Sequence, residues 1–150
     1  EYCMTSQLNV DTIVDKAGSG GTNVKIGNTS TYVSEGGAVT QNTVQGLSKC
    51  WVRWNGSGTA AINDSLGVSS ITDTGTGTYT QTLTNPFNNT DFSIVMGIGE
   101  LGGGGNRGMG INGGVTTTQT KFYSFEFSGG GGTAANDVDL QSAAWQGDLA

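Results

Sequence analysis

The catalytic chemistry open to this chain of 150 residues is limited, because it contains no histidine. Nucleophile systems of the Ser-His-Asp and Cys-His types are therefore excluded. Two carboxylates such as Asp64 and Asp73 are the groups that glycoside hydrolysis needs, one as acid and the other as base or nucleophile. Both lie in ordinary turn sequences, Asn-Asp-Ser and Asp-Thr-Gly. We therefore expect no catalytic residue and no enzymatic activity.

Two segments have the spacing of ligand-binding motifs without the context that such motifs need. Residues 97–102 match the Gly-x-Gly-x-x-Gly dinucleotide fingerprint, which works only where a helix opens directly after a strand. Residues 103–106 are three glycines and an asparagine, a sequence that cannot begin a helix. Residues 136–139, Asn-Asp-Val-Asp, offer the oxygen ligands that Ca²⁺ accepts, yet they lack the EF-hand spacing and its final glutamate. The sequence predicts no cofactor and no metal site.

Four side chains are candidates for non-covalent binding. Trp51 and Arg53 lie on the same face of an expected strand, where an indole beside a guanidinium suits stacking against a sugar ring or a neighbouring subunit. A place in the core remains an alternative for Trp51. Arg107 and Met109 lie within residues 97–114, which include ten glycines. This stretch is predicted to be an exposed loop, either an Ω-like connection or a binding loop whose bare backbone lets a partner approach.

The composition bears on the class of fold and on the partners. Nearly half of the chain is Gly, Thr, Ser or Asn, which disfavours helices. The net charge is −6 and the six lysines and arginines are scattered, so we expect no nucleic-acid partner. No run of about 18 apolar residues is present, which argues against membrane insertion. The composition favours a lean β-rich domain that gains stability from self-association.

The distribution of apolar residues divides the chain in two. Residues 1–46 contain short strand candidates, and we expect an extended attachment segment in which Leu8, Val10 and Ile13 contact partners by strand addition. Residues 47–150 contain denser strand patterns at intervals of about 8–12 residues, separated by Gly-rich turns. This spacing is typical of an all-β domain, and we expect a small antiparallel β-sandwich or barrel, jelly-roll-like in form.

Alternation within the expected strands assigns side chains to the core. The expected inward sets are Cys50, Val52 and Trp54; Tyr79, Gln81 and Leu83; Phe92, Ile94, Met96 and Ile98; and Tyr123, Phe125 and Phe127. Asn55-Gly56 predicts a two-residue type I′ hairpin turn. Because Cys50 lies in an apolar strand, Cys3 and Cys50 are expected to be unpaired, with a Cys3–Cys50 disulfide as the alternative.

Two stretches carry a resemblance to a known group of proteins. They are Lys-Cys-Trp-Val-Arg-Trp-Asn-Gly-Ser-Gly-Thr at residues 49–59 and Asp-Ser-Leu-Gly-Val-Ser-Ser-Ile-Thr-Asp-Thr-Gly-Thr-Gly-Thr-Tyr-Thr at residues 64–80. Both resemble a module of tail-fibre-like virion proteins of marine tailed bacteriophages, and residues 4–18, especially residues 8–18, are similar to N-termini of the same group. Cys50, Arg53 and Trp54 depart from the Ala, Asn and Phe usual there. The chain after Phe92 has no counterpart in this resemblance.

The resemblance implies a non-enzymatic structural protein on the virion surface, a tail-fibre-like appendage that adsorbs to the host. It implies a homotrimer that contacts other virion proteins, with a host cell-surface glycan as a further partner, and it transfers no catalytic residue. A capsid decoration (cement) or head-fibre protein is the alternative, since it too needs a β domain and an anchoring N-terminal segment. A free carbohydrate-binding module is the third hypothesis.

Overall fold

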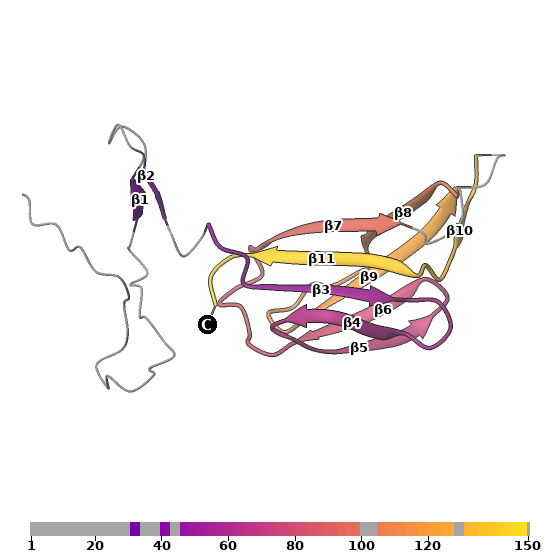
Figure 1. The fold of residues 1–150 in the computed structure, drawn as a ribbon, viewed down its shortest axis with the longest axis horizontal. Helices are drawn as coiled ribbons and strands as arrows, with labels where there is room; N and C mark the ends of the chain where they lie inside the picture. Colours follow the sequence, from indigo (N-terminus) through magenta and orange to yellow (C-terminus); the bar gives the residue numbers. More distant parts are fainter. Residues whose placement is uncertain (1–30, 34–39, 43–45, 100–104, 128–130, 150) are drawn as a thin grey trace, which may run out of the picture. The chain divides into compact units, whose positions relative to one another are not determined.

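The structure is a computed structural model that describes residues 31–33, 40–42, 46–99, 105–127 and 131–149 (Figure 1). The chain divides into two units, residues 1–44 and residues 45–150. In the first unit, β1 (Thr31–Val33) pairs with β2 (Thr40–Asn42) in an antiparallel ladder. Short strands expected within residues 1–46 are thus present, whereas Leu8, Val10 and Ile13 lie outside the described residues.

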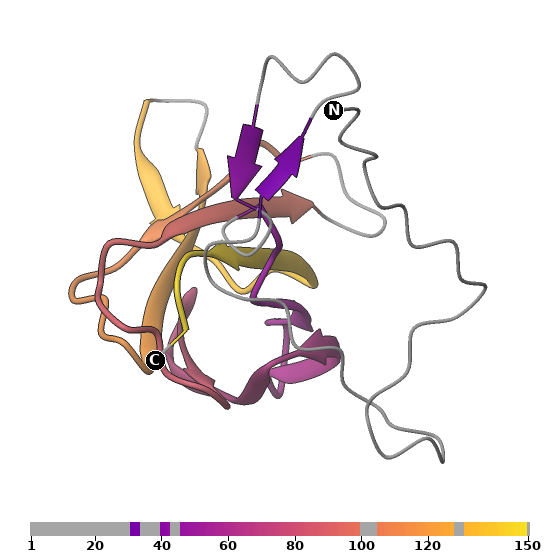
Figure 2. The ribbon, with the colours of Figure 1, turned by 90° about the vertical axis from the view of Figure 1, so that its left-hand side faces the viewer.

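The second unit is an antiparallel β-sandwich of two sheets (Figure 2, which looks roughly along the strands). The four-stranded sheet has the order β4 (Ala61–Leu66), β3 (Cys50–Asn55), β11 (Leu140–Gln146), β7 (Ser93–Gly99). The five-stranded sheet has the order β10 (Thr133–Ala135), β9 (Gln119–Phe127), β6 (Thr78–Leu83), β5 (Val68–Gly75), and β8 (Arg107–Ile111) also pairs with β9.

The expected class, an all-β antiparallel sandwich, is confirmed. The strand order departs from a jelly roll, because β3–β4, β5–β6 and β8–β9 are hairpins inside a single sheet. No helix in the part of the chain that the structure describes is long and apolar enough to cross a membrane.

Large aromatic side chains fill the space between the sheets. Trp54 contacts Tyr79 and Phe122 with ring centroids 6.2 and 5.7 Å apart, and Phe122 contacts Trp145 at 5.8 Å. All four residues are fully buried, so each sheet contributes two rings to one continuous core. The alternation predicted for β3 and β6 is confirmed, since the expected inward residues of both strands are buried.

The inward face of β9 was predicted wrongly. The buried residues are Thr120, Phe122 and Ser124, whereas Phe127 is half-exposed and Tyr123 and Phe125 also point away from the core. Burial of the two polar residues is tolerated because both are hydrogen-bonded. Thr120 accepts a hydrogen bond from Trp145 Nε1 at 3.1 Å, and the Ser124 hydroxyl donates to the Asn136 carbonyl at 2.7 Å.

Two turns show where glycine is needed and where it is not. Asn55-Gly56 does not form the predicted type I′ turn, because β3 and β4 are joined by residues 56–60 and neither Asn55 nor Gly56 has a positive φ. Gly77, in the turn between β5 and β6, has φ of +67°. A Cβ at this position would come within 2.3 Å of the Ser124 carbonyl oxygen, so the turn requires glycine.

The prediction of one long loop over residues 97–114 is also wrong. Gly97–Gly99 belong to β7 and residues 107–111 form β8, so the connection between these strands is shorter than expected. β9 and β10 pair as an antiparallel hairpin. Cys50 is a free, buried cysteine, and burial raises its pKa to about 11. Cys3 lies outside the described residues.

Candidate functional site

The outer face of the four-stranded sheet carries a row of apolar side chains that crosses all four strands. Strand register places Leu66 beside Trp51, Trp51 beside Ala144, and Ala144 beside Val95. Leu66 and Val95 are 55 and 59% exposed, and Trp51 is partly exposed. We call these four residues the apolar row. Alternation explains it, because Trp51 has the opposite orientation to the buried Cys50 and Val52.

A second row, with polar character, lies one step along the same face. The register aligns Asp64 with Arg53, Arg53 with Ser142, and Ser142 with Gly97. The Ser142 hydroxyl donates to the Gly97 carbonyl oxygen, and a Cβ at Gly97 would come within 2.7 Å of the same hydroxyl. We call these residues the polar row. It places a guanidinium, a carboxylate and a hydroxyl next to the apolar row.

The parts of the two rows on β3, β11 and β7 line a shallow groove of about 430 Å³. Its sides are Trp51 and Arg53 on β3 and Val95 on β7, and its floor is formed by small residues of β11 and β7, namely Ala144, Ser142 and Gly97. A groove forms here because the short side chains of β11 lie between longer side chains of β3 and β7. The outward position predicted for Trp51 is thus found, while Trp54 is fully buried.

The other two predicted binding residues lie elsewhere. Arg107 and Met109 are on β8, whose register sets them beside Glu126 and Ser124 of β9. Arg107 Nη1 lies 2.5 Å from Glu126 Oε2, and the Arg107 side chain is only 12% exposed. Met109 packs against the core. Both side chains face the interior side of the five-stranded sheet, so they do not join the groove.

The two carboxylates considered for catalysis are not brought together, and one considered for metal binding takes part in hydrogen bonds within the fold. Asp64 is on β4 and Asp73 is on β5, in different sheets. Asp137 accepts hydrogen bonds from the backbone N–H of Gly77 and from the hydroxyl of Tyr79. Among the described residues no group of three or more potential metal-ligating side chains occurs.

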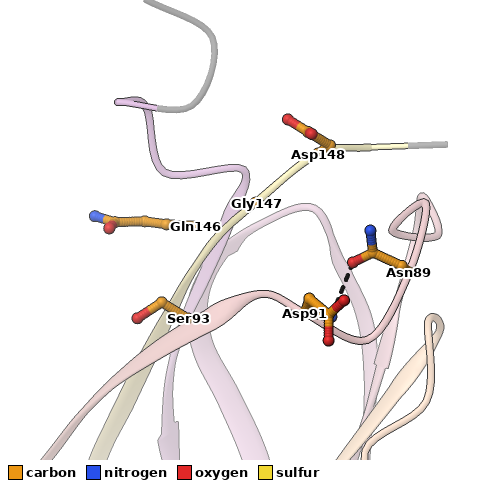
Figure 3. A pocket seen from close by; sticks show the side chains of 6 residues that line it. All are labelled: Asn89, Asp91, Ser93, Gln146, Gly147 and Asp148. Atoms are coloured by element: carbon orange, nitrogen blue, oxygen red, sulfur yellow. Dashed lines mark hydrogen bonds between the residues drawn. The ribbon is translucent and has the colours of Figure 1, made fainter. Parts of the chain in front are cut away.

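A second hollow, of about 260 Å³, lies where the β6–β7 connection meets the end of β11 (Figure 3). Its lining includes Asp91 and Asp148, whose carboxylates point in different directions in Figure 3. The backbone N–H of Asp91 donates to the side-chain oxygen of Asn89 at 2.8 Å, which is a local turn contact. Its lining, from the ends of β7 and β11 and the adjoining loops, is mostly polar and lacks an aromatic side chain for stacking.

Four of the eight residues in the two rows were not predicted from the sequence. Leu66, Val95, Ala144 and Ser142 are distant from Trp51 along the chain, and only strand pairing brings them to it. The register between β3, β11 and β7 depends on contacts between residues more than forty positions apart in the chain, and no local sequence pattern indicates it.

Comparison of the chain with known protein families, with curated proteins and with solved structures finds no match.

Proposed function

We propose that this chain is a non-enzymatic protein of the exterior of a tailed bacteriophage virion, a tail-fibre-like appendage that adsorbs to a polysaccharide of the host surface. The groove on the outer face of the four-stranded sheet carries this proposal. It combines a partly exposed indole with a guanidinium and a hydroxyl on an open surface, and the carboxylate of Asp64 lies beside the guanidinium. The resemblance of residues 49–59 and 64–80 to virion proteins supports the location of the chain on the particle.

The chemistry of the groove suits a pyranose unit. The apolar face of a sugar ring stacks on an indole, and its hydroxyl groups hydrogen-bond to charged and polar side chains. Trp51 supplies the indole, and Arg53 and Asp64 supply a donor and an acceptor beside it. The short side chains of the floor let a flat ring approach the sheet closely. A long polymer can lie across such an open face, because nothing in the groove requires a chain end.

The test is binding of the purified chain to polysaccharide isolated from the host cell surface. Trp51→Ala is expected to weaken binding about fivefold or more, since loss of a stacked aromatic removes about 1–3 kcal/mol. The matched control is Leu47→Ala, which truncates another exposed apolar side chain, one that does not line the groove. Binding that survives Trp51→Ala unchanged would exclude the groove as the adsorption site.

Location on the particle is tested separately by quantitative mass spectrometry of purified virions. A copy number that matches the tail proteins supports the appendage. A copy number that follows the head lattice would instead support a capsid decoration or head-fibre protein. Absence of the chain from washed particles would contradict both and favour a free carbohydrate-binding module.

A further inference from the structure

The outer face of the five-stranded sheet carries a ladder of aromatic rings that the proposed adsorption site does not use. Tyr123, Phe125 and Phe127 follow one another along β9, with ring centroids 5.5 and 5.1 Å apart. Phe127 is 50% exposed, and the other two are partly exposed. We call these three residues the aromatic ladder. Aromatic side chains held at a surface in this way are typical of a contact site.

The aromatic ladder projects from the sheet as a ridge, and its flanks are the small residues beside it on the neighbouring strands. Strand register places Gly110 beside Tyr123 and Gly108 beside Phe125 on β8, and it places Ala135 and Thr133 beside Phe125 and Phe127 on β10. No atom lies within 4 Å of the position that a Cβ would take at Gly110, so the flank next to Tyr123 is open. A ridge beside an open strip can accept the ridge of an identical surface.

The ladder is also fixed in place before any partner binds. A Cβ at Gly108 would lie 2.4 Å from the Phe125 ring, which means that this ring covers the glycine backbone. Tyr123 stacks on Phe125 with an angle of 24° between ring planes. Rings that already hold their bound geometry lose little conformational entropy when a partner docks.

The charge on this face favours a second copy of the chain. The outward positions of β5 and β6 are Thr and Ser, and along β9 the one charged outward residue in the described range is Lys121. The whole chain has a net charge of −6, whereas no carboxylate occupies an outward position of β5, β6 or β9 in the described range. Two acidic copies therefore meet with the least repulsion through the ladder face.

Ring orientation argues against a polysaccharide at the ladder. The planes of Phe125 and Phe127 differ by 79°, so the two rings cannot both lie flat under consecutive sugars. A membrane surface is disfavoured as well, because a single lysine does not provide the basic cluster that anionic lipids attract.

We propose that two copies of this chain associate through the aromatic ladder, with the ridge of one copy packed on the flank and ridge of the other. This contact is independent of glycan binding at the groove, which lies on the opposite sheet.

The test is the molar mass of the full-length chain by light scattering and sedimentation velocity over a dilution series. The wild-type protein is expected to have a mass that is a multiple of the 15.3 kDa chain and to dissociate on dilution. Phe127→Lys places a charge on the half-exposed end of the ladder and is expected to weaken association by at least about tenfold. Its unfolding midpoint, measured at a concentration where both proteins are monomeric, is expected to stay close to wild type.

The matched control is Val95→Lys, which adds the same charge to a similarly exposed residue on the outer face of the other sheet. This variant is expected to associate like the wild type. A wild-type chain that is monomeric at every concentration would overturn the proposal. So would an unchanged mass for Phe127→Lys, or dissociation caused by Val95→Lys instead.

Discussion

The hydroxyl oxygen of Tyr79 lies 2.8 Å from a carboxylate oxygen of Asp137 and 3.0 Å from the carbonyl oxygen of Gly56. The same oxygen of Asp137 accepts the backbone N–H of Gly77 at 2.6 Å. These contacts connect the end of β3, the β5–β6 turn and the segment between β10 and β11. Tyr79 and Asp137 together thus fix three connections at one end of the sandwich.

Removal of this hydroxyl is expected to destabilise the domain. Tyr79→Phe leaves the ring in the core but deprives a partly buried carboxylate of a donor, which costs about 1–3 kcal/mol of unfolding free energy. Urea unfolding followed by tryptophan fluorescence measures the change. Tyr123→Phe, which removes a hydroxyl from the partly exposed ladder, is the control and is expected to shift stability by less than about 0.5 kcal/mol. Equal effects of both variants would show that the Tyr79 contacts contribute little.

The glycines of β8 are expected to differ in their tolerance of a methyl group. Gly108→Ala forces the Phe125 ring off the strand, because the new Cβ would lie 2.4 Å from it, and should cost about 1–3 kcal/mol. Gly110→Ala has open space and no positive φ, so it should be neutral or stabilise the fold by up to about 1 kcal/mol. Thermal unfolding of both variants at one protein concentration makes the comparison. The reverse order would mean that Phe125 does not pack on β8.

Filling the groove is expected to weaken the proposed glycan binding without unfolding the domain. Ala144→Leu places an isobutyl group on the groove floor, at a partly exposed position. We expect at least about a tenfold loss of binding and a stability change below about 1 kcal/mol. Ala61→Leu, on β4 outside the groove, is the matched control and should bind normally. Undiminished binding by Ala144→Leu would place the glycan elsewhere.

Stability is expected to decline in alkali. Burial raises the pKa of Cys50 from 9.0 to about 11, and burial together with the Asp137 carboxylate raises that of Tyr79 above its ordinary value of 10.0. The unfolded chain therefore loses these protons first, so the folded state is progressively disfavoured as pH rises from about 9 toward 11. Denaturant midpoints across this range measure the slope. Cys50→Ala should make the decline in stability shallower between pH 9 and 11. An unchanged slope would show that the Cys50 thiol does not contribute to the decline.

Deletion of residues 1–46 is expected to separate attachment from folding. All of the described sandwich strands lie within residues 50–146, so the truncated chain should retain a β-type circular dichroism spectrum and a cooperative thermal transition. The loss of the proposed attachment residues Leu8, Val10 and Ile13 should prevent its incorporation into virions. Incorporation of the truncated chain, or its failure to fold, would refute this division of roles.

Local patterns predicted the strands well where alternation and residue size agree. In β3 and β6 the expected inward residues are the bulky ones, and burial followed the pattern. In β9 the two criteria conflict. Three aromatic residues, Tyr123, Phe125 and Phe127, alternate on one face of the strand, and the other face carries Phe122 together with the small polar residues Thr120 and Ser124. The conflict is resolved by long-range hydrogen bonds from Trp145 and to Asn136, which satisfy the small polar groups in the core.

The candidate site was predictable only in part, for a related reason. The outward position of Trp51 and Arg53 follows from alternation within one strand. Their neighbours Ser142, Ala144 and Val95 depend on which strands pair and in what register, and β11 enters the sheet between β3 and β7 as the last strand of the chain. Strand order of this kind is decided by the closure of the whole core rather than by any segment.

The apolar row also makes the groove a conformational epitope. Leu66, Trp51, Ala144 and Val95 come from four strands, so no peptide excised from the chain reproduces the surface. Antibodies raised against the denatured chain should recognise it on blots and yet fail to block the proposed glycan binding, whereas blocking antibodies should require the native fold. Any ligand of the groove binds the folded domain and not the unfolded chain, and it therefore protects the entire sandwich from unfolding in proportion to its occupancy.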